Sequence, residues 1–326
     1  MEKRLQLWTA IQELMQGFGP FYQEAVAPVM SEFPRHWNLL RAAAGLEPQP
    51  LTLQQAQQFA PYLPQAAVAI ALEALQSNGM LQTDAMPQTA VLPQTEGGHY
   101  YLTEDGAACV RSFYETAQRA LADVAPLPEE QLVWLRDALR QLVEAAATLP
   151  EPQNKIGLVG SRWSAPQEDG PLAPQIDQYV TDLYFFRDDA HVAAWERTGL
   201  SGPAWEALTF IWRDQAHTAQ ELAEQLQYRT LSEADWAVVL EGLAGRNLIE
   251  AMDGGYQLTS EGRKMREDAE ALTDELYYAA FAGLDSEELE RLLSYMEQAR
   301  DNLATLLIQQ QESLQRSHVP EPPLVV

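Results

Sequence analysis

Apolar residues near the end of the chain recur at steps of three and four positions. This spacing places them on one face of an α-helix, as a continuous stripe. The stripe comprises Leu289, Leu292, Leu293, Met296, Ala299, Leu303 and Leu307. Such a stripe must be buried, and we expect it to pack against an earlier helix with similar spacing. That helix carries Leu132, Leu135, Leu139 and Leu142.

The hydrophobic pattern occurs twice along the chain, together with the short motifs that precede its helices. Residues 102–106 read Leu-Thr-Glu-Asp-Gly and residues 258–262 read Leu-Thr-Ser-Glu-Gly, and each opens a long helical pattern. Trp37 and Trp205 stand at equivalent points further upstream. The first copy is longer in the loop between residues 83 and 98. Matches that keep the same order predict a duplicated module.

Each copy predicts the same order of secondary structure. A long first helix precedes a tryptophan-bearing helix, a short helix, a further helix, a two-stranded hairpin and two long helices. Thr52 and Thr218 are the expected N-caps of the short helices. The expected ranges are 2–31 (interrupted near 17–20), 52–60, 65–77, 80–82 and 100–102 in the first copy, and 176–197, 218–226, 233–245, 248–251 and 256–258 in the second.

A stretch rich in proline and glycine, residues 150–172, separates the two copies. This composition is typical of a linker. Within it, residues 156–160 are apolar enough that we expect a strand lying on the surface. The predicted division is a first unit at 1–149, a linker at 150–172, a second unit at 173–315 and a disordered tail at 316–326.

Length and composition limit the class of protein. The chain has 326 residues, of which 46% are hydrophobic, which suits a globular protein of two domains. No apolar run approaches the roughly 20 residues of a membrane span, and the amino terminus lacks the apolar core of a signal peptide. Cys109 is the single cysteine, so no internal disulfide forms. We therefore predict a cytoplasmic protein that does not contact a membrane.

Three segments of the second copy resemble the winged helix-turn-helix of MarR-like transcriptional regulators. Leu243–Glu250 resembles the end of that family's recognition helix, Leu258–Arg263 the exit from its wing, and Ala282–Leu289 the turn into its last dimerisation helix. The resemblance implies a mainly α fold of two tandem winged-helix units. Because family members dimerise through their terminal helices, two units in one chain imply an intramolecular pseudo-dimer.

The distribution of charge disfavours ordinary DNA binding by such a pair. The net charge is −26, which repels polyanions at long range. No Lys or Arg lies between Arg41 and Arg111, and the second recognition helix begins with Glu233 and Asp235. Contacts to phosphates and base edges need basic and amide side chains. If the second unit binds DNA, the residues expected to do so are Arg229, Arg246, Arg263, Lys264 and Arg266.

The leading interpretation is a regulator-type protein with a degenerate DNA-contact surface, which senses a small ligand or contacts a protein partner. The alternative is a working DNA-binding regulator that uses its second unit. The resemblance implies a cleft for small apolar or aromatic effectors beside the dimerisation helices. The residues expected to line it, unless they form a plain aromatic core, are Tyr184, Phe185, Trp195, Trp205 and Trp212.

Asp188 and His191 stand three apart on a predicted helix, a spacing compatible with metal ligation and hence with a metal-dependent enzyme. No second ligand pair is visible, and a surface ion pair with Arg187 is the simpler interpretation. Cys109 lies among small apolar residues, so we expect a buried and inert thiol. Since no phosphate-binding loop or Ser/His/Asp order is present, we predict no enzyme activity, no metal and no cofactor.

Overall fold

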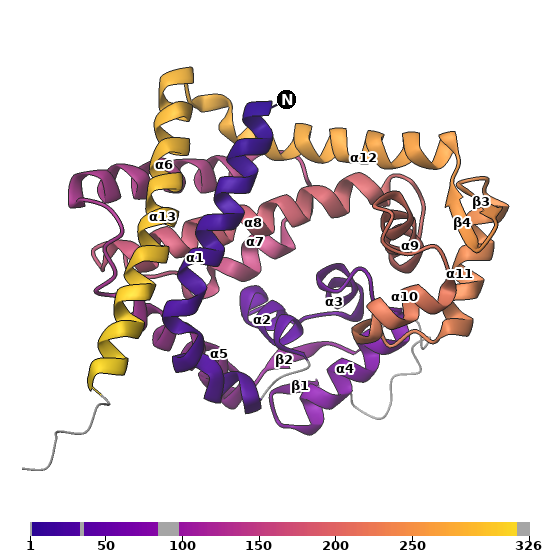
Figure 1. The fold of residues 1–326 in the computed structure, drawn as a ribbon. Helices are drawn as coiled ribbons and strands as arrows, with labels where there is room; N and C mark the ends of the chain where they lie inside the picture. Colours follow the sequence, from indigo (N-terminus) through magenta and orange to yellow (C-terminus); the bar gives the residue numbers. More distant parts are fainter. Residues whose placement is uncertain (1, 33–35, 84–97, 318–326) are drawn as a thin grey trace, which may run out of the picture.

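The computed structural model describes residues 2–32, 36–83 and 98–317. Over these ranges the fold is mainly α-helical, as predicted, with thirteen α-helices and two β-hairpins (Figure 1). The loop expected between residues 83 and 98 and most of the tail at 316–326 lie outside the described residues. Among the described helices, none combines the length and apolarity needed to cross a membrane.

The predicted order of elements is confirmed in both halves. The first half contains α1 (Glu2–Glu32), α2 (Trp37–Leu46), α3 (Leu53–Phe59), α4 (Gln65–Ser77), β1 (Leu81–Thr83), β2 (Tyr100–Leu102), α5 (Glu104–Leu121) and α6 (Glu129–Thr148). The short helix α7 (Ile156–Ser161) follows. The second half contains α8 (Leu172–Glu196), α9 (Gly202–Trp212), α10 (Ala219–Gln225), α11 (Glu233–Gly245), β3 (Ile249–Met252), β4 (Gly255–Leu258), α12 (Ser260–Tyr278) and α13 (Ser286–Ser317).

Local sequence signals account for several helix and strand boundaries. Thr52 and Thr218 each accept the backbone N–H three residues on, in reciprocal capping boxes that start α3 and α10. Ser232 caps α11 in the same way. Gly254, with a φ of +92°, forms the turn between β3 and β4, a conformation that glycine adopts at little cost. The four boundaries therefore follow from short-range chemistry.

The segment 156–160 is helical, so the surface strand predicted there is wrong. It forms α7, which packs against α2 and α8. The carboxylate of Asp189 accepts the N–H groups of Gly157 and Leu158 at 2.8 and 2.9 Å. These are donors that the first turn of a helix leaves without an internal partner. A lone strand would have left more of its backbone unpaired.

Helix α1 is continuous, and the interruption predicted near residues 17–20 is wrong. Pro20 and Pro28 both lie inside the helix, although each proline removes a helix hydrogen bond. Gly17 faces α13, where an added Cβ would lie 3.2 Å from Leu303 Cδ1. Burial of α1 against other helices therefore outweighs its weak local propensity.

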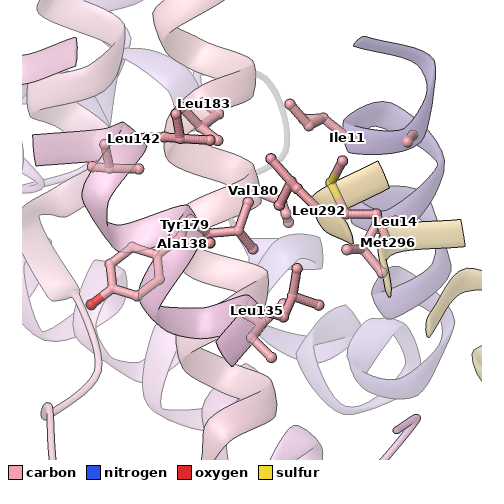
Figure 2. Close-up of a cluster of buried hydrophobic side chains, with 14 of the residues drawn as sticks. Ile11, Leu14, Leu135, Ala138, Leu142, Tyr179, Val180, Leu183, Leu292 and Met296 are labelled. Carbon is pink, nitrogen blue, oxygen red and sulfur yellow. The ribbon is translucent and has the colours of Figure 1, made fainter. Parts of the chain in front are cut away.

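The long helices of the two halves pack reciprocally. Within the halves, α1 packs against α5 and α8 against α12; between the halves, α6 packs against α8 and α13 against α1. Each closing helix thus lies on the first long helix of the other half. Figure 2 shows side chains of the central core that results: Ile11, Leu14, Leu135, Ala138, Leu142, Tyr179, Val180, Leu183, Leu292 and Met296.

The apolar stripe of α13 is buried as predicted, but its main partner differs. Leu292, Met296, Ala299 and Leu303 are at most 1% exposed. α13 packs chiefly against α1, and α6 is a lesser neighbour. Sequence periodicity identifies the face of a helix that is buried, but it does not identify which of several apolar helices covers that face.

Two smaller cores lie in what we call the helix-turn-helix regions, which are α2 to α4 with the β1–β2 hairpin in the first half and α9 to α11 with the β3–β4 hairpin in the second. The first core surrounds Leu72 and the second surrounds Trp236. These regions touch each other directly. Gly202 starts α9 so close to the first half that an added Cβ would lie 1.8 Å from the carbonyl oxygen of Pro61. The ring of Tyr62 also packs near Trp195, outside the central core. The two regions therefore share a close contact.

Candidate functional site

The recognition-helix positions of the two halves are α4 and α11. On α4 the exposed side chains include Gln65, Glu73 and Ile70, which is 65% exposed. On α11 they include Asp235 and Val238, which is 68% exposed. Neither helix carries a Lys or Arg within its bounds. The surfaces that contact base edges in helix-turn-helix proteins are therefore apolar and acidic in this chain.

These two helices line a common groove. The groove has a volume of about 700 Å³ and is bordered by Pro64 and Gln65 at the start of α4 and by Asp235 and Val238 of α11. In dimers that bind two successive major grooves, the recognition helices stand roughly 34 Å apart. A shared groove of this size brings the starts of α4 and α11 much closer together than that spacing.

Two of the five basic residues predicted to contact DNA are engaged inside the protein. Arg266 is 2% exposed. Its guanidinium bonds to Glu270 and lies 4.7 Å from the ring centroids of both Trp205 and Trp212. Arg229 donates to both carboxylate oxygens of Glu206 at 2.8–3.0 Å. Neither guanidinium is presented to a phosphate.

The other three basic residues lie on the surface. Arg246 donates to the carbonyl oxygens of Thr198 and Gly199 at 3.0 and 3.1 Å. Lys264 pairs with Asp268 one helical turn away, and Arg263 is exposed. Of the predicted set, Arg229 and Arg266 are therefore bound to other residues of the protein, and the remaining three lie on the surface near the β3–β4 hairpin.

Three adjoining cavities follow one face of α8. The central cavity has a volume of about 520 Å³, the α12-side cavity about 440 Å³ and the α5-side cavity about 320 Å³. Tyr62 and Asp188 line both the central and the α12-side cavity. Arg41 and Phe185 line both the central and the α5-side cavity, while Tyr184 lines both outer cavities. Neighbouring cavities therefore share walls.

Equivalent helices of the two halves enclose the outer cavities. The α12-side cavity lies between α1, α8, α9 and α12, and the α5-side cavity between α1, α2, α5 and α8. The α8 residues that line the three cavities recur at helical spacing: Asp177, Gln178, Thr181, Tyr184, Phe185, Arg187, Asp188, Asp189, His191 and Val192. One helix thus runs along the whole system, between the long helices and the helix-turn-helix regions (Figure 1).

His191 is neutral and fully hydrogen-bonded. Its Nε2 accepts the indole N–H of Trp205 at 3.2 Å, so Nδ1 carries the proton and donates to Thr273 Oγ1 at 3.3 Å. Burial lowers the pKa of the imidazole to about 4, although Glu270 opposes this shift. Neither ring nitrogen has a free lone pair for a metal ion. Across the described parts of the chain, no three His, Cys, Asp or Glu side chains gather as metal ligands.

Asp188 differs from its charged neighbours because no described residue donates a hydrogen bond to it. Arg187, which precedes Asp188 in the chain, is paired with Asp274 at 3.1 Å and lies over the ring of Trp8. Asp188 is open to two cavities yet enclosed by their walls. Its desolvation raises the pKa of the carboxyl to about 6, against the charges of Arg187 and Arg41. The predicted ion pair between Asp188 and Arg187 is therefore replaced by the pair that Arg187 makes with Asp274.

The aromatic residues predicted to line a pocket are partly brought together. Tyr184 and Trp205 line the α12-side cavity, and Phe185 lines the other two. Trp195 borders the groove between α4 and α11, and Trp212 packs on Arg266. Trp195 and Trp205 are also buried in the second helix-turn-helix core.

Several lining residues were missed because they come from the first half. Tyr62, Trp37 and Arg41 reach α8 from the α3–α4 loop and from α2. Asp177 was missed as well, although it falls on the same helical face as Asp188, three turns away. That periodicity was the available signal. Cys109 is buried in the first helix-turn-helix core and lines none of the three cavities.

Comparisons with known proteins give one finding. A family model described as a helix-turn-helix family matches residues 108–307, from α5 into α13. Comparisons with curated proteins and with solved structures gave no match. The matched range contains the whole helix-turn-helix region of the second half.

Proposed function

The chain belongs to the helix-turn-helix family, a regulator-type class, and on that premise we propose that it senses a small apolar or aromatic ligand in the cavities along α8. The cavity system is the observation that carries the proposal. Volumes of about 320 to 520 Å³ suit small molecules. Rings line every cavity, and the cavities separate the long helices from the helix-turn-helix regions, so a bound ligand contacts both.

In this proposal the halves at 1–149 and 173–315 form a MarR-like pseudo-dimer joined by the segment 150–172. The exchange of closing helices supports it, because α6 lies on α8 and α13 lies on α1. Such reciprocity is what a two-fold pair of these units produces. A ligand in the central cavity contacts α2 of the first half and α8 of the second. If the halves can adopt two relative arrangements, the ligand favours the one that it binds more tightly.

We further propose that α4 and α11 do not bind two DNA half-sites, and that the signal passes to a protein partner. The acidic and apolar surfaces of both helices support this, as does the net charge of −26. A second candidate function is DNA binding by the second half alone. Family membership favours it, together with the exposed Arg246, Arg263 and Lys264.

Fluorescence anisotropy with a mixed-sequence DNA duplex, over a series of rising salt concentrations, separates the two candidates. We expect no saturable binding even at low salt. Binding that falls steeply with salt, and that weakens when Arg246 and Lys264 are both replaced by Ala, would establish the second candidate in place of the first.

The ligand proposal is tested with N-phenyl-1-naphthylamine, a neutral aromatic probe whose fluorescence rises in an apolar cavity. The variants Thr181→Phe and Val192→Phe fill the α5-side and central cavities, and Thr181→Val and Val192→Ile are their matched controls. We expect saturable binding that at least one Phe variant weakens about tenfold or more and neither control changes. Binding that is equal in all five proteins would contradict the proposal.

A further inference from the structure

The α5-side cavity contains a carboxyl group that the proposed function leaves unexplained. Asp177 lines this cavity, and its Oδ1 is buried with no hydrogen-bond partner among the described residues. Two other carboxylates of α8 do accept hydrogen bonds. Oδ1 of Asp182 accepts from Ser161 and Gln178 at 2.5 and 2.7 Å, although its Oδ2 is also buried without a partner among the described residues. Asp189 accepts two N–H groups of α7. A buried polar atom without a partner is rare in native proteins and calls for a physical reason.

Aromatic rings also line this cavity. They are Tyr22, Trp37, Phe113, Tyr114, Tyr184 and Phe185. Trp37 and Phe113 are in contact, with ring centroids 4.7 Å apart. The faces of such rings attract organic cations, and an ionised carboxylate in an enclosed site needs a positive partner. The α5-side cavity provides both kinds of group at once.

Arg41 lines the same cavity, but it packs on a ring and does not pair with Asp177. Its guanidinium lies 3.9 Å from the centroid of the Phe185 ring, and its Nε is buried with no hydrogen-bond partner among the described residues. It forms no ion pair with Asp177 among the described residues. The carboxyl group of Asp177 therefore remains available to a partner from outside the protein.

We propose that the α5-side cavity binds an organic ammonium ion, with Asp177 as its counter-ion and the rings of Tyr22, Trp37 and Phe113 around the cationic group. This inference rests on the proposed function, because it specifies the chemical class of ligand at one of the same cavities. An anionic or neutral ligand would leave Asp177 unpaired. The net charge of −26 also raises the local concentration of cations around the protein.

The pairing depends on pH because Asp177 must be ionised. Burial and the adjacent charge of Asp182 raise the pKa of Asp177 to about 7. The other titratable or charged groups that line the cavity are Tyr22 on α1, Arg41 on α2, Tyr114 on α5 and Tyr184 on α8 itself. A bound cation favours the carboxylate form. The affinity for a quaternary ammonium, which has no proton to lose, should rise as the pH increases through 7 and then level off.

Two probes of the same shape test the inference: benzyltrimethylammonium and its neutral isostere neopentylbenzene. Each competes with N-phenyl-1-naphthylamine on the whole chain, in the wild type and in the variants Asp177→Asn and Asp188→Asn. Asp188 is the matched control, since it lies on the same face of α8 and also receives no hydrogen bond. We expect the cation to bind about tenfold more tightly than the isostere. Asp177→Asn should abolish this preference, and Asp188→Asn should retain it.

The outcomes separate this inference from the proposed function. Equal competition by the two probes, or a preference that survives Asp177→Asn, overturns the ammonium site and leaves the proposed function intact. If Asp188→Asn abolishes the preference for the cation as completely as Asp177→Asn does, the preference comes from the charge of the whole α8 face. That result also overturns the role of Asp177. If N-phenyl-1-naphthylamine does not bind at all, the proposed function fails. Calorimetric titration with benzyltrimethylammonium alone then decides the inference.

Discussion

The two outer cavities occupy equivalent positions in the two halves, yet their chemistry differs. On α12 the wall carries Arg266 and Glu270, where the equivalent positions of α5 hold Val110 and Tyr114. Around the α12-side cavity Arg187 and Arg266 pair with carboxylates, whereas rings surround an unpaired carboxyl in the α5-side cavity. One helical framework therefore holds a network of ion pairs at one cavity and a buried carboxyl among rings at the other. A few side chains, and not the fold, decide which.

The largest effect should come from breaking the polar network of the α12-side cavity. Replacing Arg266 by Ala leaves Glu270 without its closest cation and removes the group packed on Trp205 and Trp212. We expect the free energy of unfolding to fall by about 3 kcal/mol in urea denaturation. Arg263→Ala, an exposed change one turn earlier, should alter it by less than about 0.5 kcal/mol. Similar results for the two variants would mean that the network adds no stability.

A comparable effect, with a distinctive pH dependence, should come from Asp177. Its pKa of about 7 in the folded protein exceeds the ordinary 3.8, so the folded state binds more protons between these values. Stability from this group is therefore present at low pH and is lost as the pH rises towards 7. Relative to Asp177→Asn, the wild type should lose about 2 to 4 kcal/mol over this range. A pH-independent difference between the two proteins would contradict the raised pKa.

His191 should show a dependence of opposite sign and smaller size. Its pKa of about 4 lies below the ordinary 6.5, so the folded state binds fewer protons in this window and stability falls as the pH drops below 6.5. His191→Gln keeps an acceptor for Trp205 but does not titrate. In paired denaturation curves the wild type should lose about 1 to 2 kcal/mol relative to this variant by about pH 5. Parallel pH profiles would show that burial does not depress the pKa.

Much of the fold is predictable because its signals are local. Thr52 and Thr218 are recognisable N-caps of two helices, and Gly254 indicates a hairpin turn. The helix at Ile156–Ser161 was not predictable, because the group that caps it is Asp189, more than thirty residues later in the chain. When a distant side chain accepts the hydrogen bonds of the first N–H groups of a helix, a short apolar segment contains no local signal that distinguishes a helix from a strand.

The candidate site is predictable only in part, for a similar reason. Tyr184 and Phe185 belong to the aromatic segment that the sequence singles out, and both line cavities. Tyr62 and Arg41 reach the same cavities from the other half, so their role depends on how the halves dock. Asp177 is notable because its Oδ1 is buried without a hydrogen-bond partner among the described residues. An absent contact is a property of the packed structure, and no residue pattern in one sequence encodes it.

The exchange of closing helices has a consequence for how the chain folds. α13 completes a core that α1 begins, through contacts such as the ion pair between Arg300 and Glu13, 287 residues apart in the chain. Contacts this distant cost loop entropy before they contribute enthalpy, which slows folding. The closing helix that packs on each first long helix comes from the other half. If the chain were cut between α6 and α7, each fragment would expose an apolar surface that the other fragment normally covers. We expect each fragment to become soluble and ordered only when it binds the other.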